Sequence, residues 1–166
     1  MLYLLDANVL IDANRDYYPI DRVPEFWEWL TDAGKNDRVK VPLEVYEEIK
    51  EGNDDLAEWI KNDRNKEALL FDEDVDVSLV SRVTDDGYAD DLSDDEVEKI
   101  GRDPFLVAYA LADENNRCIV TTEGSKPSRE RANRHLPDVC NSFDVPCVNT
   151  FQFLRDLDFS TRWKER

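Results

Sequence analysis

Two aspartates, Asp6 and Asp103, have positions in the sequence that suggest a functional site. Asp6 closes the continuous apolar run of residues 1–5, which is typical of a strand buried on both faces. Asp103 precedes Pro104 at the start of an apolar stretch that predicts a helix. In open α/β sheets, ligands bind outside the carboxyl ends of the strands, so Asp6 lies where a ligand is expected. Two such carboxylates indicate a divalent-metal site.

Both aspartates also have a purely structural interpretation. An aspartate followed by proline is a preferred helix start, in which the Asp103 carboxylate would cap the first turn. Asp6 could likewise close an Asx-turn with the backbone two residues further on. The residue types alone therefore leave capping and metal binding both open.

The chain is strongly acidic. Among its 166 residues, 39 are acidic and 21 are basic, which gives a formal net charge of −18. A surface of this charge repels nucleic acid, so any contact with RNA or DNA must be local or bridged by metal. The length fits a single domain over residues 1–166.

The cysteine pattern favours a reduced, cytoplasmic protein. Cys118, Cys140 and Cys147 are odd in number, and with the single His135 they lack the spacing of an ordinary zinc site. The amino-terminal apolar run has no basic flank and is interrupted by acids. We therefore expect neither a signal peptide nor a membrane span.

The apolar pattern predicts strands that alternate with helices. The expected strands are residues 1–5, 38–41, 68–71, 118–122 and 147–148. The expected helices are residues 8–14, 24–33, 42–51, 54–59, 93–101, 103–114 and 150–157. Gly34 is expected to stop the second helix, and the acidic residues 72–95 show only a little helical spacing. This alternation favours a parallel sheet covered by helices on both faces.

Further acids converge on the same edge of the expected sheet. Glu123 follows the strand at residues 118–122, which in a parallel sheet would place it beside Asp6. The helix over residues 42–51 offers another, but its apolar residues occupy a broad arc. Glu44, Glu47 and Glu48 all lie near its margins, and periodicity does not choose among them.

Four motifs, in this order, resemble the PIN domain, the PilT amino-terminal nuclease family. They are LLDANVL at residues 4–10, EIKEG at 48–52, DPFLVAYA at 103–110 and VTTE at 120–123. The resemblance implies a three-layer α/β/α fold with a central parallel sheet. It also implies an endoribonuclease that uses Mg²⁺ or Mn²⁺ to cleave single-stranded RNA, as in the toxins of toxin–antitoxin pairs. An antitoxin protein and a second copy of the chain are then the candidate protein partners.

By this resemblance, Asp6, Glu48 and Asp103 are the catalytic residues and hold the metal. Glu48 is selected because the family's acid precedes an aliphatic residue and stands four residues before a glycine. Glu123 is a fourth metal ligand, although many members carry Asp or Asn there, and its longer side chain would reach the ion through water. Asn8 would hold Asp6 or a bound water in place.

The chemistry accounts for the choice of residues. Carboxylates forced together repel one another, and a hard cation relieves that repulsion while it retains water ligands. Such an ion lowers the pKa of a bound water and polarises a phosphate. A Ser-His-Asp or Cys-His set would need His135, the only histidine, so covalent catalysis is not expected.

One short segment could bring RNA to this acidic chain. Residues 124–135 carry four cations against Glu130 alone, directly after Glu123. The expected RNA-binding residues are Lys126, Arg129, Arg131 and Arg134. The alternative is a solvated loop and short helix whose cations balance nearby acids.

Two other functions compete with the nuclease. Residues 68–75 resemble the strand and D-x-D motif of haloacid-dehalogenase-like phosphatases through Asp72 and Asp74, but Asp76 stands where that motif needs Thr or Val. The same acids fail as a calcium loop, because the sixth position is Val77 instead of glycine. The second alternative is a catalytically inactive PIN-like module that binds RNA or protein.

Overall fold

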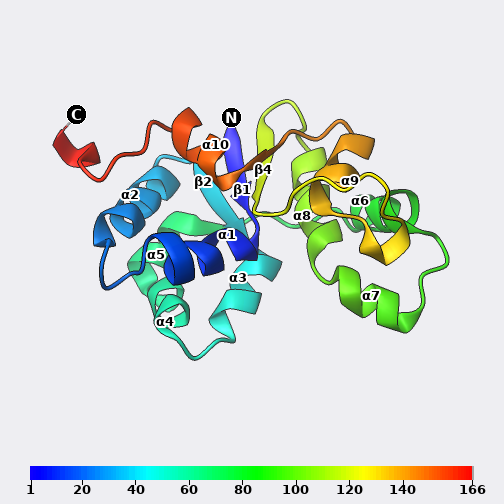
Figure 1. Cartoon of the computed structure of the whole chain (residues 1–166), viewed down its shortest axis with the longest axis horizontal. Coiled ribbons are helices and arrows are strands. Elements are labelled where there is room, and N and C mark those ends of the chain that lie inside the picture. The colour runs from blue at the N-terminus through cyan, green and yellow to red at the C-terminus, as the bar shows by residue number, and fades with distance from the viewer. Residues whose placement is uncertain (166) are drawn as a thin grey trace.

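The computed structural model describes residues 1–165 and shows a central sheet with helices on both faces (Figure 1). All strands pair in parallel, in the order β3-β2-β1-β4-β5. They are β1 Leu2–Leu5, β2 Val39–Pro42, β3 Leu70–Phe71, β4 Arg117–Thr121 and β5 Cys147–Asn149. The predicted three-layer α/β/α fold with a central parallel sheet is confirmed.

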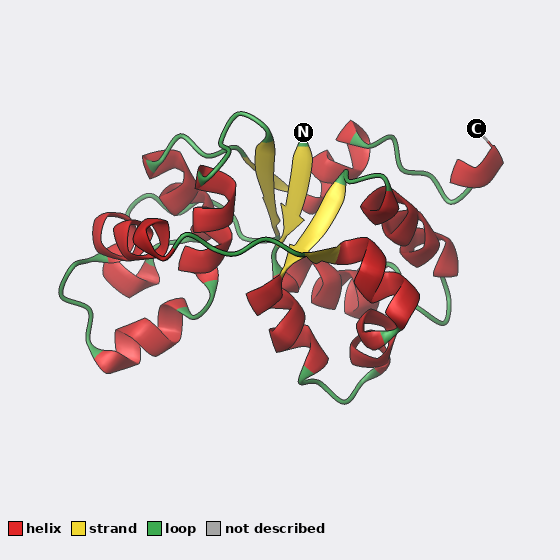
Figure 2. Ribbon diagram, turned by 180° about the vertical axis from the view of Figure 1, so that it is seen from behind, coloured by secondary structure: helices red, strands yellow, loops and turns green. Residues whose placement is uncertain are grey.

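The helices form the two outer layers, which Figure 2 shows on either side of the sheet. One layer contains α1 Ala7–Asp12, α2 Pro24–Lys35, α3 Leu43–Lys50, α4 Asp55–Lys61, α5 Asp63–Leu69 and α10 Thr150–Asp156. The other contains α6 Val77–Arg82, α7 Asp94–Ile100, α8 Asp103–Leu111 and α9 Leu136–Ser142. Within residues 1–165, none of these helices has the length and apolar character needed to cross a bilayer.

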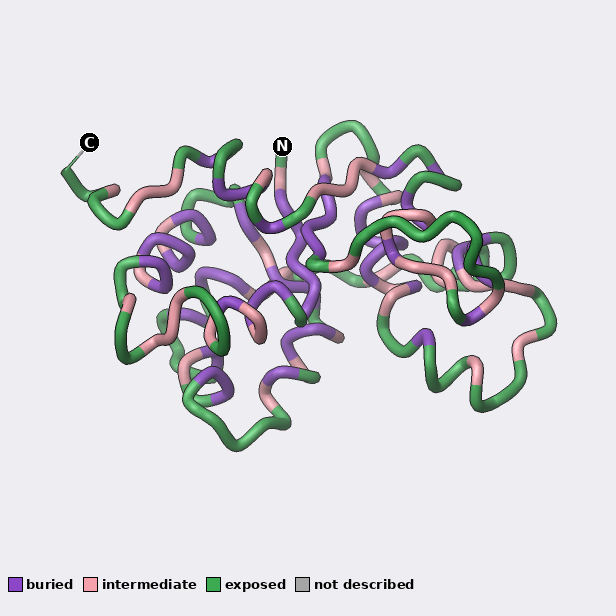
Figure 3. The backbone as a smooth tube through the Cα atoms, in the orientation of Figure 1, coloured by how far each residue is buried: buried purple, intermediate pink, exposed green. Residues whose placement is uncertain are grey.

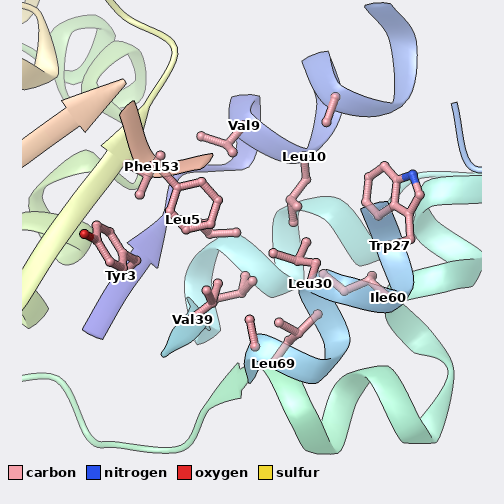
Figure 4. Close-up of a cluster of buried hydrophobic side chains, with 14 of the residues drawn as sticks. Tyr3, Leu5, Val9, Leu10, Trp27, Leu30, Val39, Ile60, Leu69 and Phe153 are labelled. Atoms are coloured by element: carbon pink, nitrogen blue, oxygen red, sulfur yellow. The ribbon is translucent and has the colours of Figure 1, made fainter. Parts of the chain in front are cut away.

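The central strands are buried on both faces, as their apolar sequences predict. In β1, Leu5 packs into the core on the α2 side, and Leu4 into the core on the α8 side. In β4, Val120 and Ile119 divide in the same way. Figure 3 shows this buried centre between exposed outer loops, and Figure 4 shows the first core, where aromatic and aliphatic side chains fill the space between sheet and helices.

Several boundaries differ from the sequence prediction. Helix α5 was not expected, because its only apolar residues lie at its end and give no helical period; its start is capped by the Asn62 side chain. The strand expected over residues 68–71 is limited to β3, because residues 68 and 69 belong to the end of α5. Helix α9 was not expected, and α7 begins with a capping box formed by Ser93 and Glu96.

Gly34 does not end α2 as expected, because the helix continues to Lys35. Its role is close packing against α5. A Cβ atom at position 34 would lie 2.7 Å from the Ala68 carbonyl oxygen and 2.7 Å from Leu69 Cδ2. The absence of a side chain therefore allows two helices of one layer to approach.

We expect Gly34→Ala to lower the free energy of unfolding by about 2 kcal/mol, because the added methyl group overpacks this contact. Urea denaturation measures the change. Gly124→Ala is the matched control, because a Cβ atom there would have no neighbour within 4 Å. Equal losses in the two variants would contradict the packing role of Gly34.

Candidate active site

The order of the strands places a crevice beside the end of β1. From the central β1 the chain continues to β2 and β3 on one side, and later to β4 and β5 on the other. Ligands bind at such a switch point, outside the carboxyl ends of the strands. Leu5 pairs in register with Val120, so Asp6, directly after β1, lies beside Thr121, the last residue of β4. A cavity of about 370 Å³ lies here, and its lining includes Asp6, Asn8, Glu48, Asp103 and Glu123.

Asp6 is the only acidic or basic residue in the buried interior of residues 1–165. Its side chain makes no helix-capping hydrogen bond. Instead, Thr121 donates its hydroxyl to Asp6 Oδ2 over 2.8 Å, and the same hydroxyl oxygen accepts the Glu123 N–H. Burial raises the pKa of Asp6 to about 6, and the nearby carboxylates of Glu123 and Glu48 add to this rise.

Asp103 is the first residue of α8, and it does not cap that helix either. Its Oδ2 accepts a hydrogen bond from the Tyr88 phenol over 3.3 Å. Burial raises the pKa of Asp103 to about 7, and repulsion from Asp6 and Glu123 contributes. The structure therefore shows neither aspartate in its capping role, and both belong to one electrostatic cluster.

The structure shows which of the three acids of α3 faces the cavity, a question that helical periodicity did not answer. Glu48 lines the cavity. Glu47 instead pairs with Lys50 over 2.8 Å. Burial raises the pKa of Tyr109, and the nearby Glu44 carboxylate adds to this rise. Glu48, the residue that the family resemblance selects, is thus the one of the three that lines the cavity. Its role as a metal ligand stays a prediction.

Glu123 and Asn8 are less directly placed. Glu123 Oε2 accepts the Leu136 N–H over 2.8 Å at the start of α9, and lies 3.9 Å from His135 Nδ1. Its carboxylate therefore already has a structural contact. Asn8 lines the cavity, but in the described chain no hydrogen bond joins its side chain to Asp6.

The four acids of the cavity are of the right chemical type to bind a hard cation, but their side chains are not close enough together to hold one. All four acids offer the oxygen ligands that Mg²⁺ and Mn²⁺ prefer. However, no three Asp, Glu, His or Cys side chains of residues 1–165 are gathered closely enough to hold an ion. Repulsion between these carboxylates adds to the effect of burial in raising the pKa of Asp6 and of Asp103. An ion would have to draw the carboxylates together.

The four basic residues expected to bind RNA divide into two pairs. Arg131 and Arg134 are held by internal contacts: Arg131 forms ion pairs with Asp91 and Glu96, and Arg134 donates to two backbone carbonyls and the Ser142 hydroxyl. Lys126 and Arg129 are exposed. Of these two, Arg129 lines a cavity that Asp103 and Glu123 also line.

Sequence reasoning missed four residues near the acids. Thr121 stands in the VTTE motif directly after a buried strand, which is a signal that the sequence did offer. Lys99 and Arg102 line the cavity and flank the motif that starts at Asp103. Tyr88 lies in the acidic segment, and nothing in its sequence context indicates its contact with Asp103.

A family model described as "Domain of unknown function (DUF4411)" matches residues 3–161. The matched range contains all four acids of the cavity and the basic segment that follows them. No curated protein and no solved structure matches the chain.

We expect Asp103→Asn to stabilise the metal-free protein above neutral pH. The pKa of Asp103 is raised from 3.8 to about 7, so the folded state favours the proton and wild-type stability falls as pH rises through this interval. Asparagine removes the charge and still offers an oxygen to Tyr88. In EDTA, the variant should be more stable by about 2 kcal/mol at pH 8, and this advantage should disappear near pH 4.

Urea denaturation at both pH values measures this difference. The control is Asp63→Asn, which removes an exposed carboxylate at the start of α5, in the helical layer on the other face of the sheet. A wild type that is equally or more stable than Asp103→Asn at pH 8 would show that the Asp103 carboxylate is not strained.

A second prediction concerns the acid of α3. Glu48→Gln should weaken Mn²⁺ binding by at least about tenfold, because it removes a charged ligand from the cavity. Glu47→Gln is the matched control on the same helix, since Glu47 pairs with Lys50. Calorimetric titration of Mn²⁺ into both variants decides between them, and a selective loss in Glu47→Gln would refute the placement.

Proposed function

The chain belongs to the DUF4411 family, and we propose that it is a divalent-metal-dependent endoribonuclease that cleaves single-stranded RNA. One observation carries the proposal: four acids from separate elements line one cavity at the switch point of the sheet. Burying Asp6 there opposes folding unless the charge is compensated. Carboxylates with raised pKa values in a cleft are typical of functional sites.

Asp6, Glu48 and Asp103 would hold Mg²⁺ or Mn²⁺, with Glu123 as a fourth ligand through water. When bound, such an ion supplies an activated water and stabilises negative charge on a phosphate. The resemblance to PIN-domain toxins makes the toxin of a toxin–antitoxin pair the setting that we propose, with an antitoxin protein as partner.

The chain's own polar groups would keep the ligands oriented. The Thr121 hydroxyl fixes one oxygen of Asp6. The Tyr88 phenol does the same for Asp103. Burial raises the pKa of Tyr88 far above neutrality, so the phenol remains a hydrogen-bond donor. Hydrogen bonds to metal-binding side chains commonly set the orientation of those side chains.

The approach of RNA needs local cations, because the chain carries a net charge of −18. Lys99 and Arg102 line the cavity with the acids, and Arg129 lines the space beside it. Lys126 is exposed nearby in sequence. These cations support a polyanionic substrate at this edge of the sheet.

The structure offers less support for the alternatives. Asp72 and Asp74, the acids of the phosphatase motif, are exposed after the edge strand β3 and do not line the cavity. A module that binds RNA without cleaving it is favoured by one observation, the contact between the Glu123 carboxylate and Leu136. Cleavage is the property that separates this module from the nuclease.

We expect Mn²⁺ or Mg²⁺ to support endonucleolytic cleavage of labelled single-stranded RNA, and Asp6→Asn to lower the rate by more than about a hundredfold. Asparagine retains the acceptor for Thr121 but loses the charged ligand. Glu47→Gln, outside the cavity, should cleave as the wild type does. Equal cleavage by wild type and Asp6→Asn, or cleavage undiminished in EDTA, would refute the assignment.

A further inference from the structure

The candidate active site continues into a second cavity of about 340 Å³. Lys99, Asp103 and Glu123 line both cavities, so these residues form a wall that the two spaces share. The second cavity also carries Arg129 and Arg134. A strand with one phosphate at the acids therefore has a cationic space next to it for another.

The cations of this region differ in how far they are already neutralised. Arg131 is paired with two carboxylates, and the Arg134 guanidinium is taken up by protein oxygens. Lys99 donates to the neutral amide oxygen of Asn133 over 2.5 Å. In residues 1–165, Lys99 has no ion pair, and the Arg129 guanidinium has neither an ion pair nor a hydrogen bond. Two uncompensated positive charges thus remain in this wall and cavity.

Internal contacts hold these two cations in one place. Arg131 binds both oxygens of Glu96 on α7, over 2.8 Å each, and Glu96 is itself fixed by the capping box with Ser93. The backbone of Arg131 has a φ of 52°, a left-handed conformation that side-chain contacts must stabilise. The Arg131 clamp joins α7, which carries Lys99, to the segment that carries Arg129. The guanidinium of Arg131 is thus already engaged within the protein.

We propose that Lys99 and Arg129 form a subsite for the phosphate next to the scissile one in a single RNA strand. The inference rests on the proposed ribonuclease function and adds the position at which the strand is held. Adjacent phosphates are covalently linked, so a cation pair beside the acids holds the strand in register over them. The subsite contacts the backbone and not a base, so it favours substrates by charge and not by sequence.

The test measures binding of a short labelled oligouridylate by fluorescence anisotropy, over a range of salt concentrations with Mn²⁺ present. All proteins carry Asp6→Asn to prevent cleavage. Lys99→Ala combined with Arg129→Ala should weaken binding by roughly tenfold at low salt and flatten the salt dependence by about 1.4, which is two single-strand contacts. The pair Lys99→Gln and Arg129→Gln repeats the loss of charge with longer side chains, which guards against a folding defect.

The matched control is Lys35→Ala combined with Arg38→Ala. It removes the same charge from exposed residues that precede β2, at the amino ends of the strands and away from the cavities. If the control and the test variant lose affinity equally, only net charge matters and the subsite is refuted. An unchanged salt slope in the test variant refutes it as well.

Cleavage by the protein with Asp6 intact separates the subsite from the proposed activity. If that protein does not cut RNA but the slope flattens as expected, the nuclease assignment fails and the subsite stands as an RNA-binding site. If it cuts RNA and the slope is unchanged, the nuclease assignment stands and the subsite fails.

Discussion

Burying a carboxylate costs free energy unless a cation or hydrogen bonds compensate it, and Asp6 is buried at the end of the central strand. The β1–β4 register supplies one compensation, because it brings the Thr121 hydroxyl within 2.8 Å of Asp6. A neutral donor such as this hydroxyl leaves the negative charge in place. The rise in the pKa of Asp6 expresses the remaining cost, and a cation in the cavity is the contact that would remove it.

The two outer layers meet where this charge lies. Helix α3 belongs to the layer on one face of the sheet and α8 to the layer on the other, and the two are in contact. Glu44 of α3 lies close enough to Tyr109 of α8 for its charge to raise the pKa of the phenol. Glu48 lies one turn after Glu44, and Asp103 begins the helix that carries Tyr109. The packing of α3 on α8 therefore sets where the acids of the two helices stand relative to each other.

The parts of the site that sequence predicted are those with local causes. An apolar strand that ends in Asp6 and a helix that begins at Asp103 are each contained in a few residues, and both elements are present in the structure. The choice among the acids of α3 depends in part on neighbours from the opposite layer, such as Tyr109 near Glu44, so periodicity left it open. The fate of Arg131 depends on Asp91 and Glu96, which come from a distant segment whose position a sequence pattern does not show.

The distribution of charge affects how the binding of a polyanion at the cavity would depend on salt concentration. Distant acids repel a polyanion through a field that salt screens beyond about 8 Å at physiological ionic strength. The local cations attract it through contacts that salt weakens. In the proposed complex, raising the salt concentration would reduce the repulsion and the attraction together, so we expect the overall salt dependence of RNA binding to be smaller than for a basic protein with the same number of contacts. In a chain with charge −18, the few cations that lack carboxylate partners would then decide where the proposed strand is held.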